Sequence, residues 1–138
     1  MIVGSKAFFS SYEDFNPKDT DYLQLVDEGD IFTNFLQSHC KGFCCFEYVK
    51  KSKEEMIEDA LKSKTGMVVG KFLVLEFIKE INMTIEDLKT LKPLIEKLDE
   101  KHLYEKVIYE SYIQNNDFYL TQEQLDEAYK IYKLYRQE

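Results

Sequence analysis

The stretch Ile2-Val3-Gly4-Ser5, followed later by Asp19-Thr20-Asp21, decides the fold. Ile2-Val3 is too short an apolar run for a helix and predicts a buried strand. The Gly4-Ser5 pair comes directly after it and lets the backbone and a hydroxyl approach a bound anion closely. Residues 19–26 predict a second strand, on which Asp19 and Asp21 face the same way. Two convergent carboxylates are costly to ionise without a cation, so the stretch predicts a site for divalent metal and a nucleoside triphosphate.

A third predicted strand, residues 43–49, carries one charged side chain, Glu47. A carboxylate in a buried strand needs a partner, and a metal ion is one such partner. Alternatively, this strand lies at the edge of the sheet and Glu47 faces water. The sequence leaves both interpretations open.

The Gly-Ser turn, the Asp-x-Asp strand and the later acidic residue together resemble the motif of the nucleotidyltransferase superfamily, which has the DNA polymerase beta-like fold. The run Pro17-Lys18-Asp19-Thr20-Asp21-Tyr22 is similar to that of small, often phage-encoded members. The resemblance covers roughly the first fifty residues. Thr20 stands where the family usually has an aliphatic residue.

The resemblance implies transfer of a nucleoside monophosphate from a triphosphate to a hydroxyl, with release of pyrophosphate. Asp19, Asp21 and Glu47 would then be the catalytic residues and would bind Mg²⁺ or Mn²⁺. Gly4 and Ser5 would hold the phosphates. The acceptor stays open between an RNA end, a protein side chain and a small molecule.

The composition changes near residue 52, from β-branched and aromatic strands to helices rich in Lys, Glu and Leu. The expected fold is therefore α+β or α/β, with a small mixed sheet of about three strands followed by a C-terminal helical bundle. Residues 1–51 form the nucleotidyltransferase-like core in this interpretation. Residues 52–138 form a helical extension packed on the core in a single compact unit.

The helical half contains one long apolar segment, residues 67–81, which predicts a buried central helix. Lys71 lies within it and either reaches a phosphate or extends to solvent. Helix starts are predicted at Ser52, at Thr84 and at Thr121, each followed three residues later by an acidic or amide side chain. Pro93 either kinks a helix or begins the next one.

Tyrosines are concentrated in the C-terminal third, and Tyr129, Tyr132 and Tyr135 share one side of the last predicted helix. Their rings either stack on a nucleobase or form an ordinary packing stripe. The packing stripe is the favoured interpretation.

The charge balance limits the partners. Eighteen basic residues against 26 acidic ones give a net charge of −8, which argues against broad non-specific binding to DNA. No apolar run is long enough to span a bilayer, and no signal-peptide pattern begins the sequence, so we expect a cytoplasmic protein without membrane contact.

A second hypothesis comes from another functional class. The same fold with a minimal core would act as a catalytically inactive, acidic module that binds or inhibits a partner. Stabilisation by triphosphate and metal distinguishes the enzyme from such a module.

Overall fold

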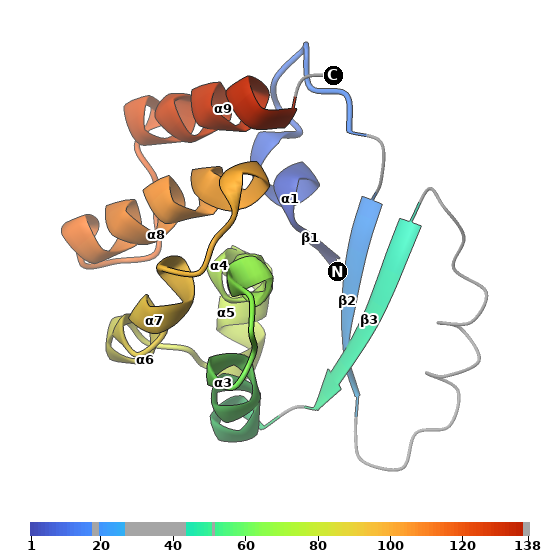
Figure 1. Ribbon diagram of the computed structural model, residues 1–138, viewed down its shortest axis with the longest axis vertical. Coiled ribbons are helices and arrows are strands. Elements are labelled where there is room, and N and C mark those ends of the chain that lie inside the picture. Colours follow the sequence, from blue (N-terminus) through green and yellow to red (C-terminus); the bar gives the residue numbers. More distant parts are fainter. Residues whose placement is uncertain (18–19, 27–43, 51, 137–138) are drawn as a thin grey trace.

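The computed structural model describes residues 1–17, 20–26, 44–50 and 52–136 (Figure 1). Three strands, β1 (Ile2–Val3), β2 (Thr20–Val26) and β3 (Cys44–Lys50), form one sheet. β2 is central, because it pairs antiparallel with β1 and parallel with β3. The fold is mixed α+β, as the sequence predicts, and the described sheet is small and mixed.

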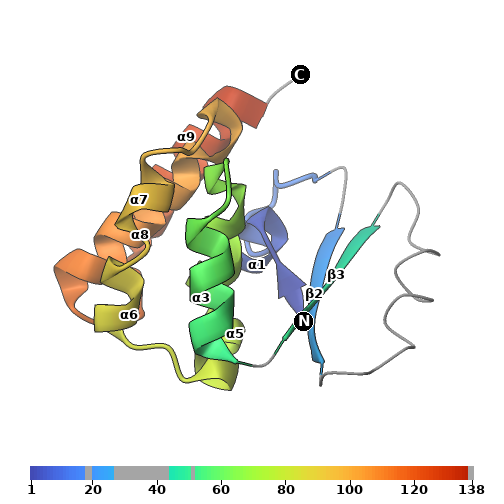
Figure 2. The same cartoon turned by 60° about the horizontal axis from the view of Figure 1, so that its bottom comes forward.

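Helices make up most of the rest of the described chain. α1 (Ser5–Phe9) follows β1 directly. The others are α3 (Lys53–Leu61), α4 (Val69–Leu73), α5 (Leu75–Ile81), α6 (Ile85–Lys89), α7 (Lys92–Ile95), α8 (Leu103–Asn115) and α9 (Gln122–Arg136), with 3₁₀ turns η1 (Gly66–Val68) and η2 (Glu100–His102). In both views β2 and β3 lie on one side, helices α3 to α9 lie on the other, and α1 lies between (Figures 1 and 2). Within the described ranges, no helix has the length and apolar character needed to cross a bilayer.

The prediction of a single central helix over residues 67–81 is wrong, because the segment contains two helices, α4 and α5. Val74 has extended backbone angles (φ −79°, ψ 123°) and separates α4 from α5. The break frees the carbonyl of Leu73 from its usual helical partner, and the buried hydroxyl of Tyr112 donates to it at 3.0 Å. Burial raises the pKa of Tyr112, which keeps this donor protonated. A contact from α8 therefore stabilises a bend that local sequence does not reveal.

The predicted helix starts are confirmed. Ser52 caps α3 by accepting from the backbone N–H of Glu55. Thr84 and Thr121 each form a capping box, the first with Asp87 and the second with Gln124. Pro93 lies in the first turn of α7 and does not kink a longer helix.

An aromatic cluster around Phe9 joins the beginning of the chain to its end. Phe9 is fully buried, and its ring centroid lies 5.4 Å from that of Tyr104 in α8 and 5.1 Å from those of Tyr129 and Tyr132 in α9. The packing interpretation favoured from sequence therefore holds for Tyr129 and Tyr132, whereas Tyr135 is 39% exposed. The aromatic cluster fixes α1 against α8 and α9.

Two tyrosine–carboxylate bonds reinforce this joint. The Tyr12 hydroxyl donates to Asp126 at 2.5 Å, and the Tyr129 hydroxyl donates to Asp14 at 2.6 Å. Burial and the bond to Asp126 raise the pKa of Tyr12 to about 12. Both bonds link the segment after α1 to α9.

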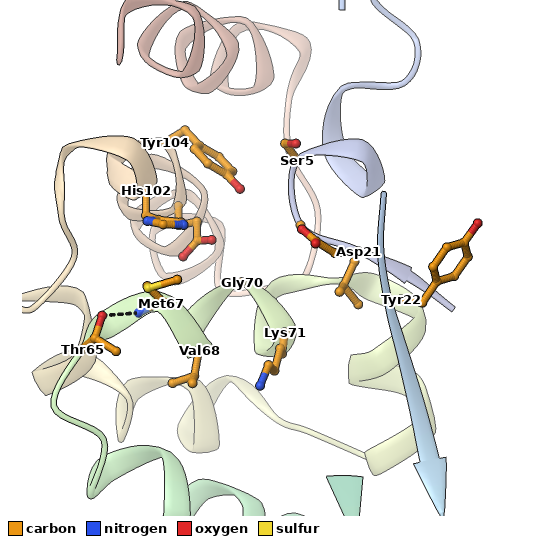
Figure 3. Close-up of a pocket in the computed structure, with 13 residues that line it drawn as sticks. Ser5, Asp21, Tyr22, Thr65, Met67, Val68, Gly70, Lys71, His102 and Tyr104 are labelled. Atoms are coloured by element: carbon orange, nitrogen blue, oxygen red, sulfur yellow. Dashed lines mark hydrogen bonds between the residues drawn. The ribbon is translucent and has the colours of Figure 1, made fainter. Parts of the chain in front are cut away.

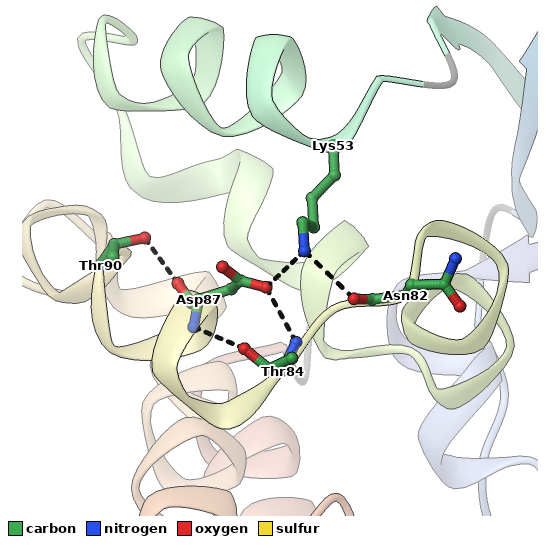
Figure 4. A network of polar contacts seen from close by, with 5 residues as sticks. All are labelled: Lys53, Asn82, Thr84, Asp87 and Thr90. Carbon is green, nitrogen blue, oxygen red and sulfur yellow. Dashed lines mark hydrogen bonds and ion pairs between the residues drawn. The ribbon is translucent and has the colours of Figure 1, made fainter.

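A polar network joins α3 to α6 (Figure 4). The Lys53 ammonium donates to Asp87 Oδ2 at 2.8 Å and to the carbonyl of Asn82 at 3.2 Å. The same Asp87 oxygen accepts from the backbone N–H of Thr84 at 3.0 Å. Burial opposes ionisation of Asp87, but these hydrogen bonds outweigh it and hold the pKa of its carboxyl below the ordinary value.

The first prediction concerns acid stability. A carboxyl with a lowered folded-state pKa contributes stability above its ordinary pKa of 3.8, and that stability is lost as the pH falls through the folded value. Asp87→Asn should therefore be less stable than wild type at neutral pH, and the gap should narrow below pH 3.8. Urea unfolding across the acid range measures this gap. A gap independent of pH would contradict the assignment.

The second prediction concerns Gly66, where η1 approaches α7. A Cβ on Gly66 would overlap the carbonyl oxygen of Leu94 and lie 2.8 Å from the amide nitrogen of Leu98. Both are backbone atoms, which cannot rotate away, so Gly66→Ala should lose about 1–3 kcal/mol of unfolding free energy. Lys64→Ala, at an exposed position nearby, should change it by less than about 0.5 kcal/mol. Equal urea midpoints for the two variants would show that η1 does not lie this close to α7.

Candidate functional site

A cleft of about 450 Å³ lies between the sheet side and the helical side of the molecule. One wall is the β1–α1 turn with β2, and the other is formed by η1, α4 and the start of α8 (Figure 3). Four of the residues selected from sequence line it: Gly4, Ser5, Asp21 and Lys71. The structure thus brings together the predicted phosphate turn, one predicted acidic residue and the predicted lysine.

Asp21 lies directly over the Gly4 turn. The pairing of β1 with β2 sets Asp21 opposite Val3, next to Gly4. A Cβ on Gly4 would lie 2.7 Å from Asp21 Oδ2, so a side chain there would displace the carboxylate. Gly4 also has φ 74° and ψ −156°, a conformation that only glycine adopts readily.

The alternation of β2 explains why Asp21 faces inward. Leu23, two residues further on, lies on the same face of the strand and is 1% exposed. Asp21 therefore points toward the helical side, where its carboxylate enters the cleft.

The other two predicted acidic residues stand differently. Asp19 lies outside the described residues. Glu47 is in β3, where its backbone pairs with Leu23, two positions along from the Asp21–Cys45 pair. The side chain of Glu47 lies outside the described part of the structure. Among the side chains that are described, no three of the acidic, His or Cys type gather closely enough to hold a metal ion. The metal site stays a prediction that depends on Asp19 and Glu47.

The helical wall contributes a buried carboxylate that sequence reasoning missed. Glu105 is 2% exposed and lines the cleft. A Cβ on Gly70 would lie 2.5 Å from Glu105 Oε1, so the missing side chain of Gly70 makes room for the carboxylate. Its helical spacing was the available signal, because Glu105 is three residues before Ile108 and seven before Tyr112 on the buried stripe of α8.

A histidine–aspartate pair borders the same wall. His102 Nδ1 lies 2.5 Å from Asp99 Oδ1, and the His102 ring lines the cleft. The hydrogen bond with His102 holds the pKa of Asp99 below its usual range. His102 was not among the residues selected from the sequence, although the spacing Asp99-x-x-His102 was an available signal.

The third prediction tests the turn that supports the cleft. Gly4→Ala forces a side chain into a glycine-only conformation and against Asp21, so it should lose about 1–3 kcal/mol of unfolding free energy. Ser5→Ala, one residue further on, should change it by less than about 0.5 kcal/mol. Thermal and urea unfolding of both variants measure the difference, and equal stability would mean that the turn is not strained in this way.

Comparison with known proteins gives no match: no protein-family model, no curated protein and no solved structure is detectably similar to this chain. The nucleotidyltransferase resemblance therefore stays a prediction from the motif residues, and the geometry of the cleft is what bears on function.

Proposed function

We propose that the cleft binds a nucleoside triphosphate and transfers its nucleoside monophosphate to a hydroxyl acceptor, with release of pyrophosphate. The observation that supports this most is the meeting of Gly4, Ser5 and Asp21 in one cleft with Lys71. The backbone of the Gly4 turn, the Ser5 hydroxyl and the Lys71 ammonium are groups that bind phosphate oxygens. The Asp21 carboxylate is a group that binds the metal ion accompanying a triphosphate.

In this proposal the phosphates lie against the β1–α1 turn. Gly4 lets the backbone approach the phosphate oxygens, and the Ser5 hydroxyl donates to them. Lys71, from the opposite wall, neutralises part of the triphosphate charge. These roles orient the α-phosphorus within the cleft and use no group beyond the chain's own residues.

The metal is part of the same proposal. Asp19, Asp21 and Glu47 would hold Mg²⁺ or Mn²⁺, because hard cations prefer carboxylate oxygens. When bound, the ions supply charge stabilisation for the attacking and leaving oxygens. Among the described side chains Asp21 fits this role, since its carboxylate lies in the cleft beside the phosphate turn.

The fourth prediction tests the proposal at Asp21. Asp21→Asn keeps the size of the side chain but removes its charge, so the hold on a hard cation falls. Magnesium-dependent transfer from α-labelled nucleoside triphosphates to RNA or protein acceptors should fall by about two orders of magnitude or more. The melting temperature should change little, because the amide fills the same space.

Asp59→Asn is the matched control. Asp59 is an exposed aspartate in α3 and does not line the cleft. The transfer activity of Asp59→Asn should therefore equal that of wild type. Equal activity of wild type and Asp21→Asn at matched stability would overturn the catalytic proposal. If triphosphate and Mg²⁺ then raise the melting temperature without any transfer, the chain is a nucleotide-binding module. If they leave the melting temperature unchanged, the result supports the hypothesis of an acidic partner-binding module.

A further inference from the structure

A hydrogen bond between α1 and β2 joins the two halves of the proposed site. The Lys6 ammonium donates to the hydroxyl of Thr20, with Nζ and Oγ1 3.2 Å apart. Lys6 directly follows Ser5 in the first turn of α1, and Thr20 directly precedes Asp21 at the start of β2. The bond therefore links the helix that follows the phosphate turn to the strand that carries the carboxylate.

The bond lies at the point where backbone pairing between β1 and β2 ends. Val3 pairs with Asp21, and at Gly4 the chain turns with φ 74° into α1. The Lys6 side chain then reaches back from α1 to Thr20, the neighbour of Asp21 in β2. A side chain thus continues the connection one residue beyond the backbone ladder.

Thr20 is well suited to transmit this constraint to Asp21. It is β-branched, so its side chain has few rotamers, and a hydrogen bond at Oγ1 restrains its backbone as well. The position of Asp21 is tightly limited, because a Cβ on Gly4 would lie only 2.7 Å from Asp21 Oδ2. A shift at the start of β2 would therefore move the carboxylate against the turn or away from it.

Lys6 makes this contact outside the cleft. It is not among the described residues that line the cleft, whereas Lys71 is. Lys6 instead lines a separate hollow of about 650 Å³ that α1 and α5 border. An effect of Lys6 on the site therefore has to pass through Thr20 rather than through direct contact with a phosphate.

We propose that Lys6 and Thr20 are positioning residues, which hold Asp21 beside the β1–α1 turn at the separation that a metal-bound triphosphate requires; this inference rests on the proposed function. Asp21 then offers its carboxylate to the cation from a fixed direction, while the turn binds the phosphate oxygens. Groups that fix a metal ligand without touching the metal typically contribute about 10- to 100-fold to metal affinity or activity.

The fifth prediction compares Lys6→Met and Thr20→Val, each of which removes one partner of the bond and keeps roughly the size of the side chain. Calorimetry with Mn²⁺ and a non-hydrolysable nucleoside triphosphate should show about tenfold weaker Mn²⁺ binding in both variants, and Mg²⁺-dependent kcat should fall by a similar factor. The double variant should bind Mn²⁺ no more weakly than either single variant, because both changes remove the same bond. Lys6→Arg and Thr20→Ser keep the donor and the acceptor, so each should bind Mn²⁺ nearly as wild type does.

Lys97→Met is the matched control. The Lys97 ammonium donates to the carbonyl of Ser63 at 3.0 Å, so it also joins two separate segments, and Lys97 does not line the cleft. This variant should leave Mn²⁺ binding and kcat unchanged. The melting temperatures of Lys6→Met and Thr20→Val should stay close to that of Lys97→Met.

Three outcomes would overturn the inference and leave the transferase proposal intact. The first is wild-type Mn²⁺ binding and kcat in both variants. The second is a lower melting temperature without a change in Mn²⁺ affinity, which would show a purely structural bond. The third is a higher KM for triphosphate in Lys6→Met alone, with Thr20→Val like wild type, which would show direct contact of Lys6 with phosphate. A wild-type chain that neither binds the triphosphate with Mn²⁺ nor transfers from it would overturn the proposed function and the inference with it.

Discussion

The burial of Phe9 is the constraint on which the rest of the structure depends. α1 begins at Ser5, on one wall of the cleft, and ends at Phe9, whose ring packs on Tyr104, Tyr129 and Tyr132. Tyr104 in turn lies in the first turn of α8, on the other wall. One aromatic cluster therefore sets the position of both walls. Aromatic pairs of this kind contribute more stabilising free energy than their buried area alone would give. The width of the cleft is a consequence of core packing.

Two glycines, Gly4 and Gly70, shape the cleft between these walls. Gly4 leaves room for the carboxylate of Asp21, and Gly70 leaves room for that of Glu105. The two acids enter from opposite walls, one from a strand and one from a helix. This arrangement places one carboxyl side chain in each wall of the cleft, each beside a glycine that makes room for it.

Local features of this chain could be predicted from its sequence, and tertiary ones could not. The caps at Thr84 and Thr121 depend on neighbouring residues, and the turn at Gly4 with the strand of Asp21 depends on a short motif, so both could be read directly. The bend at Val74 depends on a hydroxyl from α8, and Glu105 enters the cleft only because α8 packs on α4. Such contacts join residues far apart in sequence, so the helical spacing of Glu105 indicates a buried position on α8 but not the cleft that it lines.

The most direct test of the central claim is a crystal structure with a non-hydrolysable nucleoside triphosphate and Mn²⁺, whose anomalous scattering marks the ion. The account predicts phosphate density against Gly4 and Ser5, with Mn²⁺ bound by Asp21. Triphosphate bound elsewhere on the molecule, or Mn²⁺ in the cleft without contact to Asp21, would contradict it.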